Sequence, residues 1–189
     1  MKRTLALTEI YVNMADIIST SDDARSAPDA DRPDQPLTAA GRPEIAMIEL
    51  LFFAYRDFVS DPDAILESYG FGRAHHRVLH FVNRRPGMRV AELLDTLRIT
   101  KQSLGRVLKQ LLETGFIEQR PGATDRRQRL LYPTAEGRAL SLRLLEPQIR
   151  RVRTAMAALS PDQAEAARSF LLTMLDEHER DAVARLVAR

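Results

Sequence analysis

The sequence predicts a mainly α-helical fold with one small β-hairpin. Two observations lead to this class. From about residue 44 onward, apolar residues recur every three or four positions, which is the repeat of helices with one buried face. Over 116–132 the repeat changes to every second position, around a turn that contains proline and glycine, as expected of two paired strands. Helices are therefore expected on both sides of a single hairpin.

Composition limits the classes of protein that fit. The chain has 189 residues, 44% of them apolar, which is enough for a hydrophobic core. It has no cysteine, which excludes a disulfide framework, a cysteine-ligated zinc site and a thiol redox switch. No stretch approaches the ~20 apolar residues that a membrane-spanning helix needs. We therefore expect a soluble, cytoplasmic protein with no membrane partner.

Residues 1–43 are expected to form an N-terminal arm that is largely disordered. The stretch 19–43 is rich in Asp, Ser, Ala and Pro and has too little apolar surface to offset the entropy lost on ordering. The stretch 5–18 is more apolar and is compatible with a short helix. The globular part is therefore expected to begin near Glu44.

Capping residues and breakers divide the first helical stretch. An apolar stripe predicts a helix over 44–60. Asp61 followed by Pro62 is a typical helix start and predicts a separate short turn that ends by Gly70. A further helix is expected over 72–84, before the Pro86-Gly87 stop.

The most informative stretch predicts a helix-turn-helix. A short helix over 90–97 is followed by Thr100, a favoured N-cap residue, and by a second helix over 101–114. Gly115 lies where a helix often ends in a left-handed residue. Two short helices joined by a tight turn form this motif.

A basic hairpin follows directly, with strands expected over 116–120 and 127–132. Such a hairpin behind a helix-turn-helix is a wing. Thr134 then caps a helix through about Ala158, and a Ser160-x-x-Gln163 capping box begins a last helix that should run to near the C-terminus.

The predicted architecture is thus a winged helix-turn-helix domain over 72–133 plus a helical dimerisation region over 44–71 and 134–189. The helices of the second region carry more apolar stripe than one small domain can cover, which favours a two-fold homodimer.

The charge of the chain is concentrated in one block. Residues 73–131 contain 13 Lys or Arg and 5 Asp or Glu, whereas residues 44–72 contain 1 and 6. A block of this kind either attracts a polyanion such as nucleic acid or forms a solvated surface rich in arginine. The winged helix-turn-helix pattern favours double-stranded DNA.

In the order and spacing of its motifs, the stretch from about 44 to 185 resembles the MarR family of bacterial transcriptional regulators. The resemblance is carried by residues 90–93, 100–106, 111–117, Asp125-Arg126-Arg127 and Thr134-x-x-Gly137. It implies a dimer, a palindromic duplex operator and often a small-molecule effector that weakens DNA binding. The sequence departs from the family pattern at Arg98, Gly105 and Pro133.

The recognition helix, 101–114, is expected to present its N-terminal half to base edges in the major groove. Gln102 suits adenine, and Lys101 or Arg106 suits guanine. One turn further on, contacts to phosphate are expected. The candidate DNA-binding residues on this helix are Thr100, Lys101, Gln102, Ser103, Gly105, Arg106, Lys109 and Gln110. The plain alternative is a solvated helix face.

The wing, 118–130, is expected to enter the minor groove, where an arginine meets concentrated negative potential. The resemblance implies that Arg127 is the inserted residue and that Asp125 braces the wing through a salt bridge. For Arg126 and Arg129, contact with phosphate and a solvated edge strand are both open.

A group of aromatic, basic and histidine residues is the candidate effector pocket. Its members are Phe52, Tyr55, Arg56, Phe58, Tyr69, Phe71, His76 and His80. For the aromatic residues, dimer core is the favoured alternative, and for Arg56 it is an ion pair with a neighbouring acid.

Other functions have weaker support. His76 and His80, four residues apart, would suit a metal-responsive regulator, but no third protein ligand is evident, so no metal and no cofactor are expected. No catalytic motif is present, so we expect no enzyme. A winged helix that binds protein instead of DNA remains the other alternative.

Overall fold

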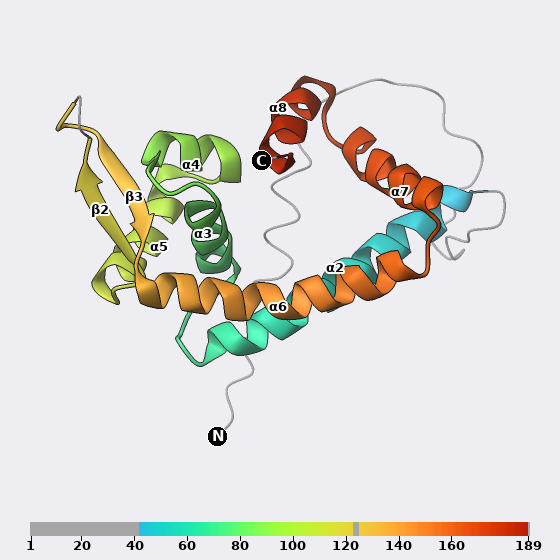
Figure 1. Cartoon of the computed structure of the whole chain (residues 1–189), viewed down its shortest axis with the longest axis horizontal. Coiled ribbons are helices and arrows are strands. Elements are labelled where there is room, and N and C mark those ends of the chain that lie inside the picture. Colours follow the sequence, from blue (N-terminus) through green and yellow to red (C-terminus); the bar gives the residue numbers. More distant parts are fainter. Residues whose placement is uncertain (1–41, 123–124, 189) are drawn as a thin grey trace, which may run out of the picture. The chain divides into compact units, whose positions relative to one another are not determined.

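The computed structural model describes residues 42–122 and 125–188. The expected N-terminal arm, up to residue 41, and the short helix expected over 5–18 lie outside this range. The chain divides after Ile45, and residues from Ala46 onward form one compact unit. The elements, in chain order, are α2 (Pro43–Glu67), α3 (Arg73–Arg84), β1 (Met88–Arg89), α4 (Val90–Leu97), α5 (Lys101–Glu113), β2 (Ile117–Pro121), β3 (Arg129–Pro133), α6 (Ala135–Ala157), α7 (Pro161–Thr173) and α8 (Glu177–Val187) (Figure 1).

The mainly α fold with a β-wing is confirmed. The strands form one antiparallel sheet in the order β1-β3-β2, and β2 and β3 are the expected hairpin. The pairing of Gln119 with Leu131 lies at its centre. The short strand β1 was not expected, because two residues are too few to show an alternating pattern.

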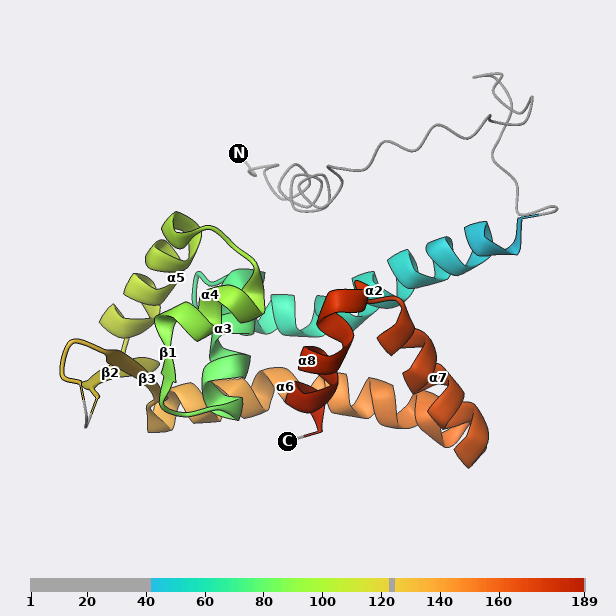
Figure 2. The ribbon, with the colours of Figure 1, turned by 90° about the horizontal axis from the view of Figure 1, so that it is seen from above.

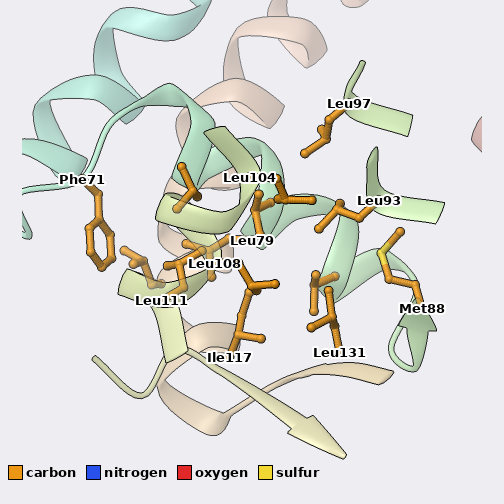
Figure 3. Packing of buried hydrophobic residues seen from close by; sticks show 14 of the residues in the cluster. Phe71, Leu79, Met88, Leu93, Leu97, Leu104, Leu108, Leu111, Ile117 and Leu131 are labelled. Carbon is orange, nitrogen blue, oxygen red and sulfur yellow. The ribbon is translucent and has the colours of Figure 1, made fainter. Parts of the chain in front are cut away.

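The hydrophobic core lies beneath the helix-turn-helix (Figure 3). Leu79 from α3, Leu93 from α4, Leu111 from α5 and Leu131 from β3 are fully buried in one cluster, which Leu144 of α6 joins. Burial of apolar side chains from five elements fixes the position of α5 relative to the sheet.

The prediction of a separate turn at Asp61-Pro62 is wrong, because α2 continues through Pro62 to Glu67. Proline removes one backbone hydrogen bond from a helix interior, but its fixed φ is helical. Val59, Pro62 and Leu66 are the buried residues of α2, at the spacing of one helix face. Their burial explains why the helix continues past the proline.

The prediction of one last helix is also wrong, because the chain breaks between α7 and α8. The guanidinium of Arg180 donates hydrogen bonds to the carbonyl oxygens of Thr173, at 2.8 Å, and Leu175, at 3.0 Å. Thr173 is the last residue of α7, where carbonyls lack partners within the helix, and Leu175 lies in the break itself. The capping box that begins α7 at Ser160 is as expected.

The apolar stripe expected to be buried on α2 is largely exposed in the single chain. Ile48, Phe52 and Tyr55 retain 49%, 51% and 55% of their accessible surface. Further large apolar side chains are exposed on α6 and α7, including Val152, Met156, Phe170 and Leu171. Figure 2 shows the ribbon of these two helices from above. None of the helices in the described ranges is long and apolar enough to cross a membrane.

Candidate nucleic-acid interface

The N-terminus of α5 is fixed by a cap. The backbone N–H of Ser103 donates to the hydroxyl oxygen of Thr100 at 3.1 Å, and the Thr100 hydroxyl donates to that of Ser103 at 2.9 Å. Thr100 is therefore the N-cap, as predicted. These two hydrogen bonds hold the start of α5 in place.

The two faces of α5 differ in chemistry. Leu104, Val107, Leu108 and Leu111 are buried. The opposite face carries the exposed residues Lys101, Gln102, Gly105, Arg106 and Lys109. Thr100, at the N-cap, is also exposed, whereas Ser103 and Gln110 are half-buried. Lys109 also lies 3.7 Å from the carboxylate of Glu113 one turn on.

Gly105 lies in open space on this face. A Cβ at this position would meet nothing within 4 Å. The fold therefore does not require glycine here. An absent side chain allows another molecule to approach the helix backbone closely.

Gln110 is placed differently from the other predicted residues of α5. Its side-chain oxygen lies 2.9 Å from Nε2 of His75 on α3, and the residue is half-buried. Nδ1 of His75 accepts from the backbone N–H of Gly72 at 3.1 Å, so the neutral ring carries its proton on Nε2 and donates to Gln110. This pair ties the recognition helix to the start of α3.

His75 was not among the predicted site residues. Its ring stacks on Phe71 with a centroid separation of 4.7 Å. Burial lowers the pKa of His75, and the hydrogen bond to Gln110 opposes this in part. The link joins residues 35 positions apart in the chain, and no local sequence pattern indicates it.

The wing is braced by Asp125, but not by the expected salt bridge. The Asp125 carboxylate accepts a hydrogen bond from the backbone N–H of Arg127 at 2.9 Å. The Asp125 carbonyl oxygen accepts from Gln128 at 3.1 Å. Because Arg127 contributes only its backbone to the brace, its side chain stays exposed and free to reach outward.

A threonine joins the end of the recognition helix to the start of α6. The Thr134 hydroxyl donates to the carbonyl oxygen of Gly115 at 2.6 Å and accepts from the backbone N–H of Gly137 at 3.0 Å. Gly115 has the expected left-handed conformation, with a φ of 76°. The Thr134-x-x-Gly137 motif therefore connects the helix-turn-helix to the long helix α6.

Ion pairs divide the basic residues of 73–131 into two groups. Some meet a carboxylate: Arg73 with Asp63, Arg85 and Arg89 with Glu92, Arg98 with Glu179, Lys109 with Glu113, and Arg120 with Glu118. The rest have no ion pair with any acid in the described ranges: Arg77 and Arg84 on α3, Lys101 and Arg106 on α5, and Arg126, Arg127 and Arg129 at the wing. Apart from the two on α3, the unpaired cations therefore lie on the recognition helix and the wing.

The residues predicted to form an effector pocket are not brought together. Phe52, Tyr55 and Arg56 lie exposed on α2. Phe71 is buried in the core, with Tyr69 stacked on it at 5.9 Å. Tyr69 and Phe71 therefore belong to the core beneath the helix-turn-helix, whereas the alternative given from the sequence was the core of a dimer interface.

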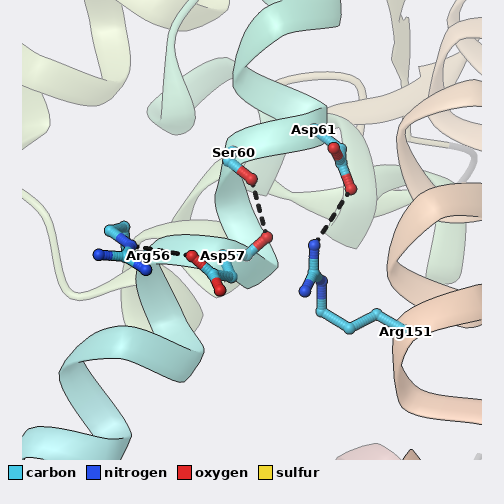
Figure 4. A network of polar contacts seen from close by, with 5 residues as sticks. All are labelled: Arg56, Asp57, Ser60, Asp61 and Arg151. Atoms are coloured by element: carbon cyan, nitrogen blue, oxygen red, sulfur yellow. Dashed lines mark hydrogen bonds and ion pairs between the residues drawn. The ribbon is translucent and has the colours of Figure 1, made fainter. Parts of the chain in front are cut away.

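Arg56 has the alternative role that the sequence suggested. It donates to the carboxylate of the adjacent Asp57 at 2.8 Å. Figure 4 shows this pair beside a second one, in which Arg151 of α6 lies 3.4 Å from Asp61. The pairing with Arg56 lowers the pKa of Asp57.

His76 and His80 lie on one face of α3, both partly buried. Burial lowers the pKa of each. The charge of His80 adds to this at His76, and the charge of Arg84 adds to it at His80. In the part of the chain that the structure describes, no group of three or more metal-ligating side chains is placed to hold a metal ion.

An open cleft of about 600 Å³ lies between α2 and α6. Its polar lining consists of Asp61, Arg143, Glu146 and Arg150. Arg143 also donates to the Tyr69 hydroxyl at 2.6 Å. None of the eight predicted effector residues lines this cleft.

Comparisons with known proteins agree with this geometry. The profile of the MarR family matches residues 69–128. The HTH-type transcriptional regulator PetP of Rhodobacter capsulatus is 46% identical over 129 residues, which cover 68% of this chain and 78% of PetP.

Two solved structures share the fold at low sequence identity. FabT of Streptococcus pneumoniae, solved in complex with DNA, matches with a TM-score of 0.62 at 16% identity, over 69% of this chain and 94% of that one. A SlyA-like transcription regulator from Listeria monocytogenes matches with a TM-score of 0.55 at 18% identity, over 75% and 89%.

Proposed function

Since the chain belongs to the MarR family of winged-helix transcriptional regulators, we propose that it binds a pseudo-palindromic DNA operator as a homodimer. In this proposal α5 of each protomer enters the major groove and each wing enters the minor groove. The relatives are regulators and not enzymes, so the function to be explained is binding.

The distribution of unpaired cations carries the proposal. Lys101 and Arg106 on α5, and Arg127 at the wing, have no carboxylate partner among the described acids, whereas most other cations of the block have one. Unpaired cations on a protruding surface favour a polyanion, because binding then requires no internal ion pair to break. A FabT structure that contains DNA is consistent with this use of the fold.

We assign separate tasks to the exposed residues of α5. Gln102 would read adenine, and Lys101 or Arg106 would read guanine, through base edges in the major groove. Lys109, one turn further from the helix start, would contact phosphate and set the register. Gln110 is left out of direct readout, since its side chain is bound to His75.

The homodimer is proposed from the exposed apolar surface. Monomeric proteins rarely expose large contiguous apolar patches. Here α2, α6, α7 and the residues just after α6 and α7 expose Met47, Ile48, Leu50, Phe52, Phe53, Tyr55, Val152, Met156, Leu159, Phe170, Leu171 and Met174. A second copy would cover this surface and would match two half-sites with two recognition helices.

Effector control is proposed at the cleft between α2 and α6 in place of the predicted pocket. Two arginines, Arg143 and Arg150, line it beside Asp61 and Glu146, so a ligand with an anionic group would find a cation there. Isothermal titration with candidate organic acids, against the double variant Arg143→Ala/Arg150→Ala, tests this site. Equal binding heats for the wild type and the variant would reject effector binding at this cleft.

The main experiment is fluorescence-anisotropy binding of the full chain to its own upstream DNA and to random duplex, over a series of salt concentrations. Tight binding to the upstream DNA with a steep negative salt slope is expected. Weak and equal binding to both duplexes would reject the proposal. The alternative of a protein-binding winged helix would then take its place.

A further inference from the structure

The C-terminal helix α8 contacts the turn of the helix-turn-helix. Arg98, which follows α4, pairs its guanidinium with the carboxylate of Glu179 on α8. The same guanidinium lies 3.5 Å from Nε2 of His178. A helix about 80 residues further along the chain thus contacts, through side chains, the segment that leads into the recognition helix.

The backbone at Arg98 is unusual. It has a φ of 50°, and it is the one residue other than glycine with a positive φ in the described ranges. A residue with a Cβ is disfavoured in this conformation, whereas glycine adopts it readily. An arginine that occupies such a position, where the fold would accept glycine, points to a use for its side chain.

Arg98 lies close to the proposed DNA surface. It precedes the N-cap Thr100 by two residues, which span at most about 7 Å of extended chain. The recognition helix enters the groove by its N-terminal end, and phosphates border that groove. A guanidinium at this turn is therefore within reach of a phosphate, provided that the function proposed above holds.

In the structure, one acidic residue, Glu179, binds this guanidinium, and further acidic residues lie near it in the chain. The start of α8 carries Asp176, Glu177, Glu179 and Asp181. Glu179 neutralises Arg98, and the other acidic residues add negative charge that would repel a DNA phosphate. The pair is partly exposed, with 58% of the Arg98 side chain accessible, and exposed ion pairs are weak enough for a phosphate to displace them.

We propose that Arg98 is a phosphate-contacting residue that Glu179 withholds from DNA, so that α8 weakens DNA binding through this pair. DNA and α8 compete for one guanidinium. The C-terminal helix α8 then helps to determine the affinity for DNA, and any partner or modification that moves α8 would change that affinity.

The test compares two single substitutions on α8 in the full chain. Glu179→Gln removes the carboxylate that holds Arg98. Glu177→Gln removes an equal charge two residues away, from a residue that has no ion pair with any described residue. Glu179→Gln should tighten binding to the upstream duplex by about threefold to tenfold and steepen the salt slope by about one per protomer. Glu177→Gln should change the affinity by less than about twofold.

A third substitution, Arg98→Gly, isolates the role of the arginine. Glycine suits the positive φ, so this variant should keep the turn and the fold, which a thermal melt verifies. In the Arg98→Gly background, Glu179→Gln should no longer tighten binding.

The outcomes separate this inference from the proposed function. Equal effects of Glu179→Gln and Glu177→Gln, or a gain from Glu179→Gln that persists without Arg98, would overturn the inference while wild-type binding stands. A wild-type chain that binds DNA without a negative salt slope would reject the proposed function itself.

Discussion

The carbonyl oxygen of Phe116 occupies the space that a side chain on Gly137 would need, because a Cβ on Gly137 would lie 1.8 Å from that oxygen. The contact joins the first turn of α6 to the residue just before β2. It explains in steric terms why glycine stands in the Thr134-x-x-Gly137 motif.

Gly137→Ala should destabilise the fold. Alanine normally favours a helix over glycine by about 1 kcal/mol. Here the methyl group would displace either α6 or the backbone at Phe116, and overpacking against backbone of this kind costs about 3 kcal/mol. Urea unfolding followed by circular dichroism measures the change. An alanine variant as stable as the wild type would contradict the contact.

Gly105→Ala provides the matched comparison on α5. Its added methyl group meets nothing within 4 Å, so the free energy of unfolding should rise by about 1 kcal/mol. If DNA approaches the helix backbone here, the same variant should bind operator DNA about tenfold more weakly. Unchanged affinity in anisotropy measurements would place the DNA away from Gly105.

Arg127→Ala should weaken DNA binding by more than about tenfold while the fold stays intact, since it removes the cation proposed for the minor groove. The substitution keeps the backbone N–H that Asp125 binds, so the wing brace should survive. Arg126→Ala, at the neighbouring exposed residue, is the control and should have a smaller effect. An unchanged dissociation constant for Arg127→Ala at fixed salt would argue against minor-groove insertion.

Phe52→Glu should shift the proposed dimer toward monomer. Phe52 is exposed in the single chain and lies outside the core beneath the helix-turn-helix. A charge within the proposed dimer interface should raise the dimer dissociation constant by about thirtyfold or more. Light scattering after size-exclusion chromatography measures the mass, and Glu49→Gln on the same helix is the control. A monomeric wild type would end the dimer proposal.

Acidification should destabilise the fold at pH values below about 6.5, the ordinary pKa of histidine. Burial lowers the pKa of His75, His76 and His80 in the folded state, so the unfolded chain binds more protons as the pH falls. The stability is therefore complete above the unfolded pKa and is lost as the pH falls toward the lower folded values. Urea unfolding at pH 7.5 and 5.5 measures this loss.

His75→Gln should reduce that loss, since glutamine does not titrate in this range. It should also change the hydrogen bond to Gln110 on the recognition helix, so DNA affinity is a second measurement. If the variant and the wild type lose the same free energy of unfolding between the two pH values, His75 does not contribute to the loss of stability on acidification.

Local signals predicted much of the DNA-binding lobe. Thr100 and Ser160 lie at caps as expected, and Gly115 ends the recognition helix as expected, because each depends on residues within a few positions in the chain. The wing was predicted for the same reason, from an alternating pattern on both sides of one turn.

Features that depend on tertiary contacts were missed. Pro62 was expected to begin a helix, but burial of its face keeps it inside α2. At the break after α7, Arg180 binds backbone carbonyls, and Gln110 is bound to His75, 35 residues away. The aromatic residues grouped as a pocket are near one another in sequence, but Phe52 and Tyr55 lie exposed on α2, whereas Tyr69 and Phe71 follow that helix and pack in the core beneath the helix-turn-helix.

The two hydrogen bonds of Thr134 couple the orientation of α6 to the position of α5. The helix has 23 residues and is therefore about 34 Å long, and its first turn is fastened to the end of the recognition helix. In the proposed dimer, a rotation of α6 by about ten degrees about its C-terminal end would move its N-terminal end, and α5 with it, by about 6 Å. Successive major grooves on one side of DNA recur about 34 Å apart, so such a displacement would put two recognition helices out of step with their half-sites.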